Sequence, residues 1–215
     1  MPFGPGRRWY RAGLHRFRRA LGFVRMDSAI RQSTAGVAEY LASEERGEVR
    51  HEYLGGVLHA MAGASAAHNA IVLNIGAELR AKLRGGPCRV FVSDFKVHLQ
   101  IAGENFFYYP DVVITCHERG IEKYFLRFPT VVFEVLSETT EAIDRREKLT
   151  NYRQTTTLEE YVLVAQDRRE VIVHRRPDGW APQVITAPEA ELKLPSLQVA
   201  LPLTRIYEDV GLPRG

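Results

Sequence analysis

The sequence predicts an α/β protein of the α+β type, in which a mixed β-sheet is flanked by helices. Strand-length apolar segments occur throughout the chain, longer segments repeat apolar residues at helical spacing, and the two kinds alternate. No repeat, low-complexity tract or Pro/Ser-rich linker follows Ser28. We therefore expect a single domain over residues 27–215.

The first half of this domain contains two predicted helices around a hairpin. Thr34 can cap a helix that runs to about Glu45. Residues 49–61 alternate around Gly55-Gly56, a dipeptide that supplies the positive φ angles of a tight turn. From Ser65 to about Arg84 an apolar residue recurs every four positions, which predicts the longest helix.

The second half is richer in strands. Residues 88–101 and 106–115 are each predicted to form a strand, and residues 102–105 join them. The apolar segment 130–137 is typical of a strand buried on both faces. A helix over about 140–154, a hairpin that turns near Asp167-Arg168 and a closing helix over 203–210 complete the order.

Composition excludes several classes of protein. The 215 residues are 45% hydrophobic and 26% charged, as in ordinary globular proteins. No apolar stretch reaches the roughly 18 residues that cross a bilayer, so we expect no membrane association. Cys88 and Cys116 are far apart and form no metal motif. We expect two small core residues and no disulfide, which fits a cytoplasmic protein.

The first 26 residues differ from the rest of the chain. They hold seven arginines and no acid, whereas the remaining residues carry 22 Lys/Arg and 26 Asp/Glu, a net charge of −4. Residues 9–24 could form a basic amphipathic helix for phosphate or membrane surfaces. Alternatively, Met26 is the true start. We favour this second interpretation and expect residues 1–26 to be a disordered or non-native extension.

Two acids stand in apolar strands. Glu134 lies within Val131–Leu136 and should share a sheet face with Val132 and Leu136. An unpaired carboxylate there would cost several kcal/mol, so a cation, hydrogen-bond network or metal is expected nearby, although a structural ion pair would also suffice. Asp111 follows Pro110 and precedes a second apolar strand, where it could also serve a simple turn. Convergence of the two acids would suit a hard cation.

Lys148 lies on the predicted helix after Glu134. It could pair with Asp144 at i,i+4 on a solvated helix face. However, the connection out of the Glu134 strand lets the first turns of this helix lean over the strand ends. Other candidates receive no role: three histidines at 51, 59 and 98 lack metal-ligand spacing, and Asp94 with Lys96 can form an exposed strand pair.

The order of these residues carries a resemblance to a known family. Tyr109-Pro110-Asp111, Glu134-Val135-Leu136-Ser137, Asp144 to Lys148 with Tyr152, and the strand Glu160–Val164 resemble the Uma group of putative restriction endonucleases, within the PD-(D/E)XK nuclease superfamily. The segment Glu52–Val57 and His68 extend the similarity over roughly residues 35–207.

The resemblance implies a restriction-endonuclease-like fold and a metal site. Asp111 and Glu134 would ligate Mg²⁺, for which Mn²⁺ could substitute, and Lys148 would assist the attacking water. Glu52 would be a further acidic ligand or lie behind the ligands, and the Val135 carbonyl could add a hard oxygen. His68 and Asp144 would support the ligands from outside. Leu136 stands where the superfamily usually has its lysine, so the assignment of Lys148 depends on the helix folding back.

The leading functional hypothesis is a metal-dependent endonuclease that hydrolyses DNA phosphodiester bonds, and a homodimer would cut both strands. The alternative is a non-catalytic nucleic-acid-binding or interaction module on the same fold, which the net charge of −4 outside the tail favours. A metal-dependent hydrolase of another phosphoester is a third hypothesis. His68 is assigned mainly a hydrogen-bonding role at its helix start.

Overall fold

The computed structural model describes residues 35–61, 63–137 and 144–212; of Asp144 and Arg145 it describes only the backbone. All of these residues fall within one compact unit, Arg31–Gly215. The predicted cap Thr34, the basic extension 1–26 and the start of the predicted helix 140–154 lie outside the described residues. No helix in the described part is long and apolar enough to cross a membrane.

The N-terminal half of the domain forms a five-stranded sheet with the strand order β2-β1-β5-β4-β7. Helix α1 (Val37–Arg46) begins after Gly36, and β1 (His51–Leu54) and β2 (Val57–Ala60) form the predicted hairpin. Its turn places Gly55 at φ 55° and Gly56 at φ 99°, which glycine adopts without strain. The other strands are β4 (Lys96–Ile101), β5 (Glu104–Tyr108) and β7 (Phe125–Leu126).

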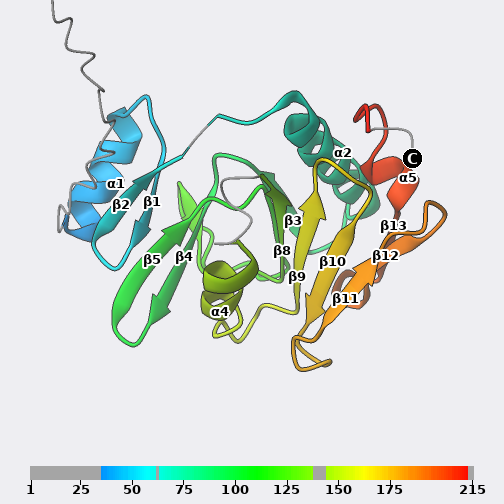
Figure 1. The fold of residues 1–215 in the computed structure, drawn as a ribbon. Helices are drawn as coiled ribbons and strands as arrows, with labels where there is room; N and C mark the ends of the chain where they lie inside the picture. The colour runs from blue at the N-terminus through cyan, green and yellow to red at the C-terminus, as the bar shows by residue number, and fades with distance from the viewer. Residues whose placement is uncertain (1–34, 62, 138–143, 213–215) are drawn as a thin grey trace, which may run out of the picture. The chain divides into compact units, whose positions relative to one another are not determined.

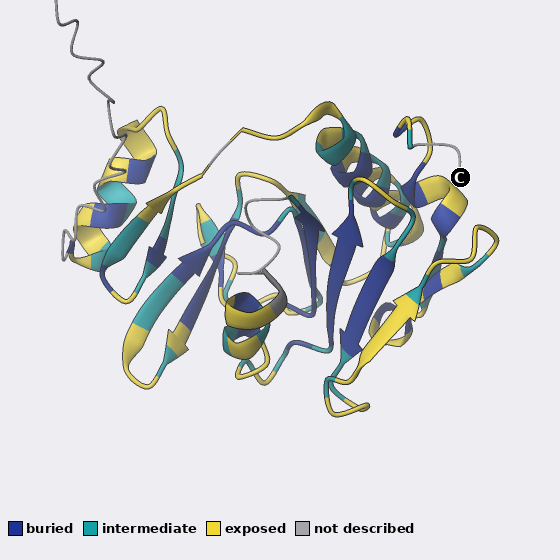
Figure 2. Ribbon diagram, viewed as in Figure 1, coloured by how far each residue is buried: buried dark blue, intermediate teal, exposed yellow. Residues whose placement is uncertain are grey.

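A six-stranded sheet forms the centre of the domain, in the order β11-β10-β9-β8-β6-β3 (Figure 1). Strands β8 (Val131–Leu136) and β9 (Glu160–Ala165) are parallel, and the other neighbours are antiparallel. Both are buried along their whole length (Figure 2), as predicted for the strand that carries Glu134. The other members are β3 (Arg89–Val92), β6 (Val112–Thr115), β10 (Val171–Arg175) and β11 (Pro182–Ile185).

Two predicted strands were too long. Residues 88–101 split into β3 and β4, and residues 106–115 split into β5 and β6, so each half belongs to a different sheet. The first predicted strand breaks at Ser93, whose φ is 55°. The second breaks at Tyr109–Asp111, where Pro110 has no N–H to donate. The chain thus crosses between the sheets beside Asp111.

Helix α2 (Ala66–Lys82) packs on the six-stranded sheet, where its buried face joins the larger core cluster. A small third sheet pairs β12 (Glu191–Leu194) with β13 (Val199–Pro202), joined by the 3-10 turn Pro195–Leu197. The closing helix α5 (Leu203–Ile206) is one turn long, shorter than the predicted 203–210.

The segment after β8 has an unusual helical geometry. A π-helical turn covers Asp144–Lys148, and α4 (Leu149–Tyr152) follows directly. Tyr152 is fully buried in a second core cluster together with Val132 and Leu136 of β8. This helical segment therefore lies over the face of β8 that carries Glu134.

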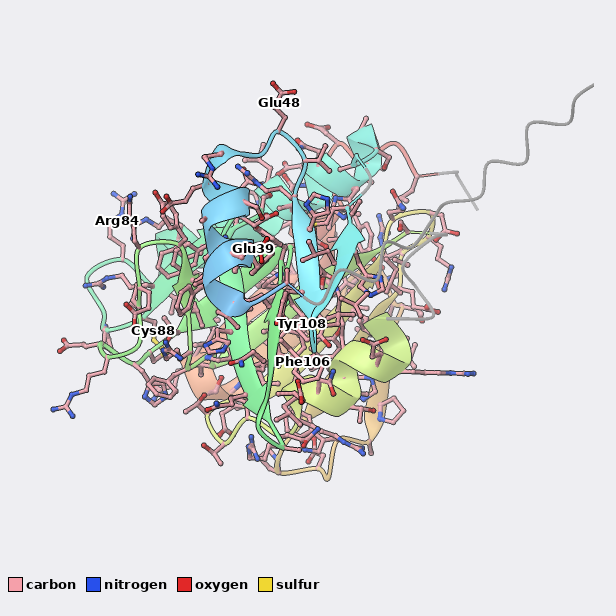
Figure 3. All side chains as sticks on the ribbon, turned by 90° about the vertical axis from the view of Figure 1, so that its left-hand side faces the viewer. Glu39, Glu48, Arg84, Cys88, Phe106 and Tyr108 are labelled. Atoms are coloured by element: carbon pink, nitrogen blue, oxygen red, sulfur yellow. A yellow bond between two sulfur atoms is a disulfide. The ribbon has the colours of Figure 1, made fainter. Side chains whose placement is uncertain are left out.

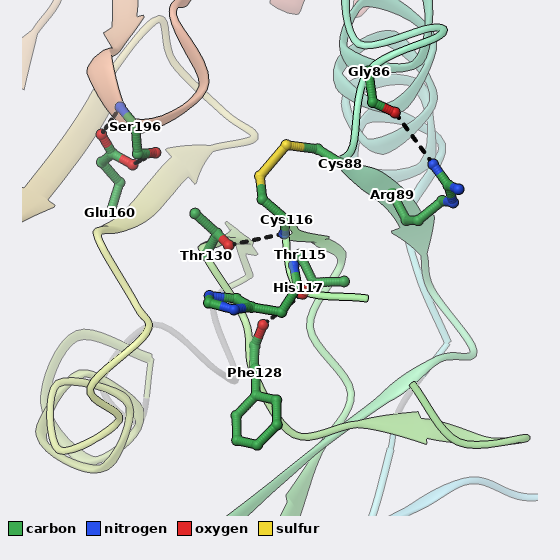
Figure 4. Close-up of a disulfide and its surroundings, with 10 residues drawn as sticks. All are labelled: Gly86, Cys88, Arg89, Thr115, Cys116, His117, Phe128, Thr130, Glu160 and Ser196. Atoms are coloured by element: carbon green, nitrogen blue, oxygen red, sulfur yellow. Dashed lines mark hydrogen bonds between the residues drawn. A yellow bond between two sulfur atoms is a disulfide. The ribbon is translucent and has the colours of Figure 1, made fainter. Parts of the chain in front are cut away.

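The cysteines form a disulfide, so the prediction of two small core residues was wrong. Cys88 and Cys116 lie one residue beyond the paired residues Arg89 and Thr115 of β3 and β6, with Cα atoms 4.0 Å apart (Figure 4). A spacing of this size is typical of directly opposed residues on antiparallel strands. The low cysteine content therefore no longer supports a reducing compartment.

Candidate active site

Asp111 lies at the end of the β6–β8 ladder. Val112 pairs with Phe133, so the antiparallel register places Asp111 opposite Glu134. The Asp111 carboxylate accepts a hydrogen bond from the Val135 backbone N–H at 2.7 Å. It thus completes the ladder where Pro110 ends regular pairing. The two strand acids of the sequence prediction are therefore cross-strand neighbours.

Lys148 provides the cation that the burial of Glu134 demands. Its Nζ lies 3.3 Å from Glu134 Oε1 and 2.9 Å from Glu52 Oε1. Glu134 is 3% exposed and Lys148 is 6% exposed. Charges so removed from water are tolerated only when they are paired. The helical segment after β8 thus folds back over the strand, as the assignment of Lys148 requires.

Glu52 enters from the five-stranded sheet. Besides its contact with Lys148, its Oε1 accepts a hydrogen bond from the Tyr109 backbone N–H at 3.3 Å. Tyr109 belongs to the segment that crosses between the sheets. One glutamate from each sheet therefore meets a single ammonium group at their junction.

His68 contacts Asp111 from a third direction. It lies in the first turn of α2, where its backbone N–H donates to the Ser65 hydroxyl at 3.0 Å, as the helix-start assignment predicted. Its side-chain Nε2 is 3.2 Å from Asp111 Oδ1. The carboxylate of Asp111 is thus held on both oxygens, by a backbone N–H and by an imidazole. The side chain of Asp144 lies outside the described residues.

These groups line one pocket of about 770 Å³. Four acids reach it, Glu52, Asp94, Asp111 and Glu134, against the single ammonium of Lys148. Histidines aside, its described lining is therefore strongly acidic. Further polar residues of the lining are His59 of β2, Ser65 and Asn69 at the start of α2, and Gln166.

The donor set suits a hard cation in chemistry, but its geometry favours an internal ion pair. The strand carboxylates offer oxygen ligands of the kind that Mg²⁺ prefers. However, no group of three or more His, Cys, Asp or Glu residues within the described ranges is arranged to hold a metal ion. Lys148 lies between Glu52 and Glu134, and Val135 presents its N–H to Asp111. Ligation of a metal ion by these residues is therefore a prediction, and it requires Lys148 to move away from Glu134.

A second buried polar network adjoins the site and was missed from the sequence. Lys96 is 4% exposed, in contrast to the predicted exposed strand pair, and it donates to the Tyr109 hydroxyl at 3.0 Å. The Tyr109 hydroxyl donates to Glu44 Oε2 at 2.6 Å. Burial lowers the pKa of Lys96, and the charge of Glu44 opposes that effect. No signal in the sequence indicated this network, because Lys96 begins a strand that alternates polar and apolar residues.

Tyrosines form the floor under Lys148. Tyr108, labelled beside Phe106 in Figure 3, lies 5.4 Å from the Tyr152 ring centroid, and Lys148 Nζ lies 5.7 Å from the centroid of the Tyr108 ring. The Tyr108 hydroxyl accepts a hydrogen bond from Asn151 Nδ2 at 2.6 Å and donates to Glu147 at 3.4 Å. The Tyr108 ring thus lies beside the ammonium of Lys148, which is largely shielded from water.

Comparison with known proteins places this geometry in a family. The family model described as "Uma2: Putative restriction endonuclease" matches residues 37–204. Two uncharacterized proteins of Synechocystis are similar to the chain: slr1290 is 35% identical over 176 residues, 80% of this chain and 91% of the relative, and sll1609 is 33% identical over 132 residues, 60% and 73%.

A solved structure shares the fold. The crystal structure of a "putative nuclease belonging to DUF820" from Anabaena variabilis superimposes with a TM-score of 0.64 and covers 76% of this chain and 93% of that one. Its sequence is 17% identical, so the likeness concerns the fold alone. The predicted mixed α+β, nuclease-like fold is confirmed.

Proposed function

Because this chain belongs to the Uma2 family, described as putative restriction endonucleases, we propose that it hydrolyses DNA phosphodiester bonds with the help of a divalent metal ion, Mg²⁺ or Mn²⁺. The observation that carries the proposal is the pairing of Asp111 with Glu134 at a ladder end, with Lys148 on Glu134 and all three in one pocket. The three residues are 14 to 37 positions apart in the sequence. Burying their charges costs free energy, and apolar residues could serve a purely structural role without that cost, which favours a functional role.

Asp111 and Glu134 would hold the metal ion, with Val135 as a source of a further backbone oxygen. A divalent ion at such a site supplies a nucleophilic water and offsets the negative charge of the phosphate in the transition state. Lys148 would point its ammonium at that developing charge. Glu52 would hold Lys148 in place, and His68 would fix the Asp111 carboxylate.

The acidity of the pocket supports the cation requirement. Four acids and one lysine repel a bare phosphate, so DNA would enter only after a divalent cation has offset the charge. The net charge of −4 outside the N-terminal extension is consistent with a site whose local charge is set by bound metal.

A cleavage assay tests the proposal. Supercoiled plasmid, single-stranded DNA and RNA are incubated with Mg²⁺ or Mn²⁺ and with the parent protein, Asp111→Asn or the control Asp178→Asn, which alters an exposed acid in the turn after β10. Asparagine keeps an oxygen that accepts from the Val135 N–H. We expect metal-dependent nicking or linearisation by the parent and the control, and a loss of at least about a hundredfold in Asp111→Asn. Equal cleavage by all three proteins contradicts the site.

The alternative, a non-catalytic nucleic-acid-binding module, is favoured by one observation: Lys148 already pairs with Glu134, one of the two acids that would hold the metal, and no metal-holding group is arranged within the described ranges. A module predicts metal-independent DNA binding by both the parent and Asp111→Asn, with no cleavage by either. A homodimer stays a prediction that sedimentation or size-exclusion measurements can check.

A further inference from the structure

The hydroxyl of Tyr152 is an exception among the polar groups around Lys148. The residue is 0% exposed, and among the described residues its oxygen has no hydrogen-bond partner. A buried hydroxyl without a partner costs free energy that a phenylalanine would avoid. The other tyrosines of this region do not share the defect: Tyr108 bonds with Asn151 and Glu147, and Tyr109 with Glu44 and Lys96.

The position of Tyr152 ties it to the candidate site. It follows Lys148 by four residues and packs its ring between those of Tyr108 and Tyr161, at centroid distances of 5.4 and 5.5 Å. Burial, and after it the negative charge of Glu134, raise the pKa of Tyr152 well above its ordinary value. Tyr152 also shares a core cluster with the two β8 residues that flank Glu134 on the same strand face, so its hydroxyl is a hydrogen-bond donor on the face that carries this carboxylate.

The resting ion pair explains what such a spare donor could do. Glu134 is 3% exposed, and Lys148 Nζ donates to its Oε1 at 3.3 Å. In the proposed function Lys148 would turn from Glu134 toward the phosphate. A buried carboxylate that gives up a charged donor is less well compensated unless another donor replaces it. Tyr152 supplies a donor from the same helical segment without any new residue entering the site.

We infer that Tyr152 is a positioning residue, whose hydroxyl donates a hydrogen bond to Glu134 when Lys148 turns from that carboxylate toward bound cation and phosphate. The inference rests on the proposed function. The hydroxyl then holds Glu134 in its ligating orientation and lowers the cost of freeing Lys148. The hydroxyl that has no partner while Lys148 contacts Glu134 would gain one, the Glu134 carboxylate, once cation and phosphate are bound.

The test compares Tyr152→Phe with Tyr108→Phe. Urea midpoints are measured without metal, and Mn²⁺ affinity is measured by titration calorimetry. Tyr152→Phe should keep or raise the midpoint, because it deletes an unpartnered hydroxyl, whereas Tyr108→Phe should lower it by leaving Asn151 without its acceptor. Tyr152→Phe should also weaken Mn²⁺ binding at least tenfold, an effect that a purely structural role would not produce.

Three outcomes overturn the inference: unchanged Mn²⁺ affinity in Tyr152→Phe, a midpoint lowered as far as in Tyr108→Phe, or a parent protein that binds no Mn²⁺. The proposed function fails in a different way. A parent that binds Mn²⁺ more tightly than Tyr152→Phe but cleaves no nucleic acid would refute the nuclease while leaving the role of Tyr152 supported.

Discussion

Replacement of Lys148 by methionine should destabilise the protein strongly, because one ammonium serves the buried carboxylate of Glu134 and the partly buried carboxylate of Glu52. The oxygens of Glu52 and Glu134 lie 2.9 and 3.3 Å from the same nitrogen, so they are no more than about 6 Å apart. At an effective dielectric constant of about 20, two unit charges at that distance repel by about 3 kcal/mol. Removal of one partner from a buried ion pair is expected to cost about 3–5 kcal/mol, because the other charge stays buried without compensation.

The same geometry predicts an asymmetry between the partners. Glu52→Gln leaves Lys148 and Glu134 as a neutral pair, so it should cost much less than Lys148→Met, which leaves two like charges. Urea midpoints followed by circular dichroism measure both, with Lys193→Met on an exposed position of β12 as the control, expected within about 0.5 kcal/mol of the parent. If Lys148→Met unfolds at the midpoint of this control, the ammonium does not hold the two acids together.

Two further predictions concern other parts of the fold. Burial raises the pKa of Glu160, and its hydrogen bonds to Ser196 oppose this effect, so the folded state binds a proton more tightly than the unfolded state. Stability should therefore fall as the pH rises from the ordinary carboxyl pKa through the raised value, and Glu160→Gln should remove this pH dependence from denaturation curves. An unchanged slope of stability against pH would contradict the assignment. The disulfide closes a loop of 28 residues, so chain entropy predicts that it stabilises the folded state by about 3.5 kcal/mol. Dithiothreitol should lower the urea midpoint of the parent but not that of the double variant Cys88→Ala/Cys116→Ala. A parent whose midpoint does not respond to the reductant would mean that the two thiols are not joined.

Local signals in the sequence were sufficient for elements whose structure is set by their own residues. The Gly55-Gly56 turn, the long helix that begins after Ser65 and the buried strand β8 each depend on a short segment, and each formed as predicted. The anomaly of an acid in that strand correctly indicated a nearby cation, because the cost of burying a charge holds in any fold.

What the sequence could not supply was pairing between distant segments. Both halves of residues 88–101 have the composition of a strand, and nothing local shows that β3 and β4 join different sheets. The same lack of register concealed the disulfide, since Cys88 faces Cys116 only once β3 lies beside β6. Lys96 is buried because Tyr109 and, through it, Glu44 satisfy it from other elements.

The break in the second strand explains why a site forms at this junction. A ladder that ends inside a protein leaves backbone groups without partners, and a carboxylate is a strong acceptor for them. Asp111 satisfies the Val135 N–H and Glu52 satisfies the Tyr109 N–H, so both acids make structural hydrogen bonds beside the crossing between the sheets as well as carrying charge. Their structural contacts fix the carboxylates in place, and a cation relieves the repulsion between acids so fixed without the need to protonate one of them. Lys148 provides that cation in the resting protein, and the proposed metal ion would share the task during hydrolysis.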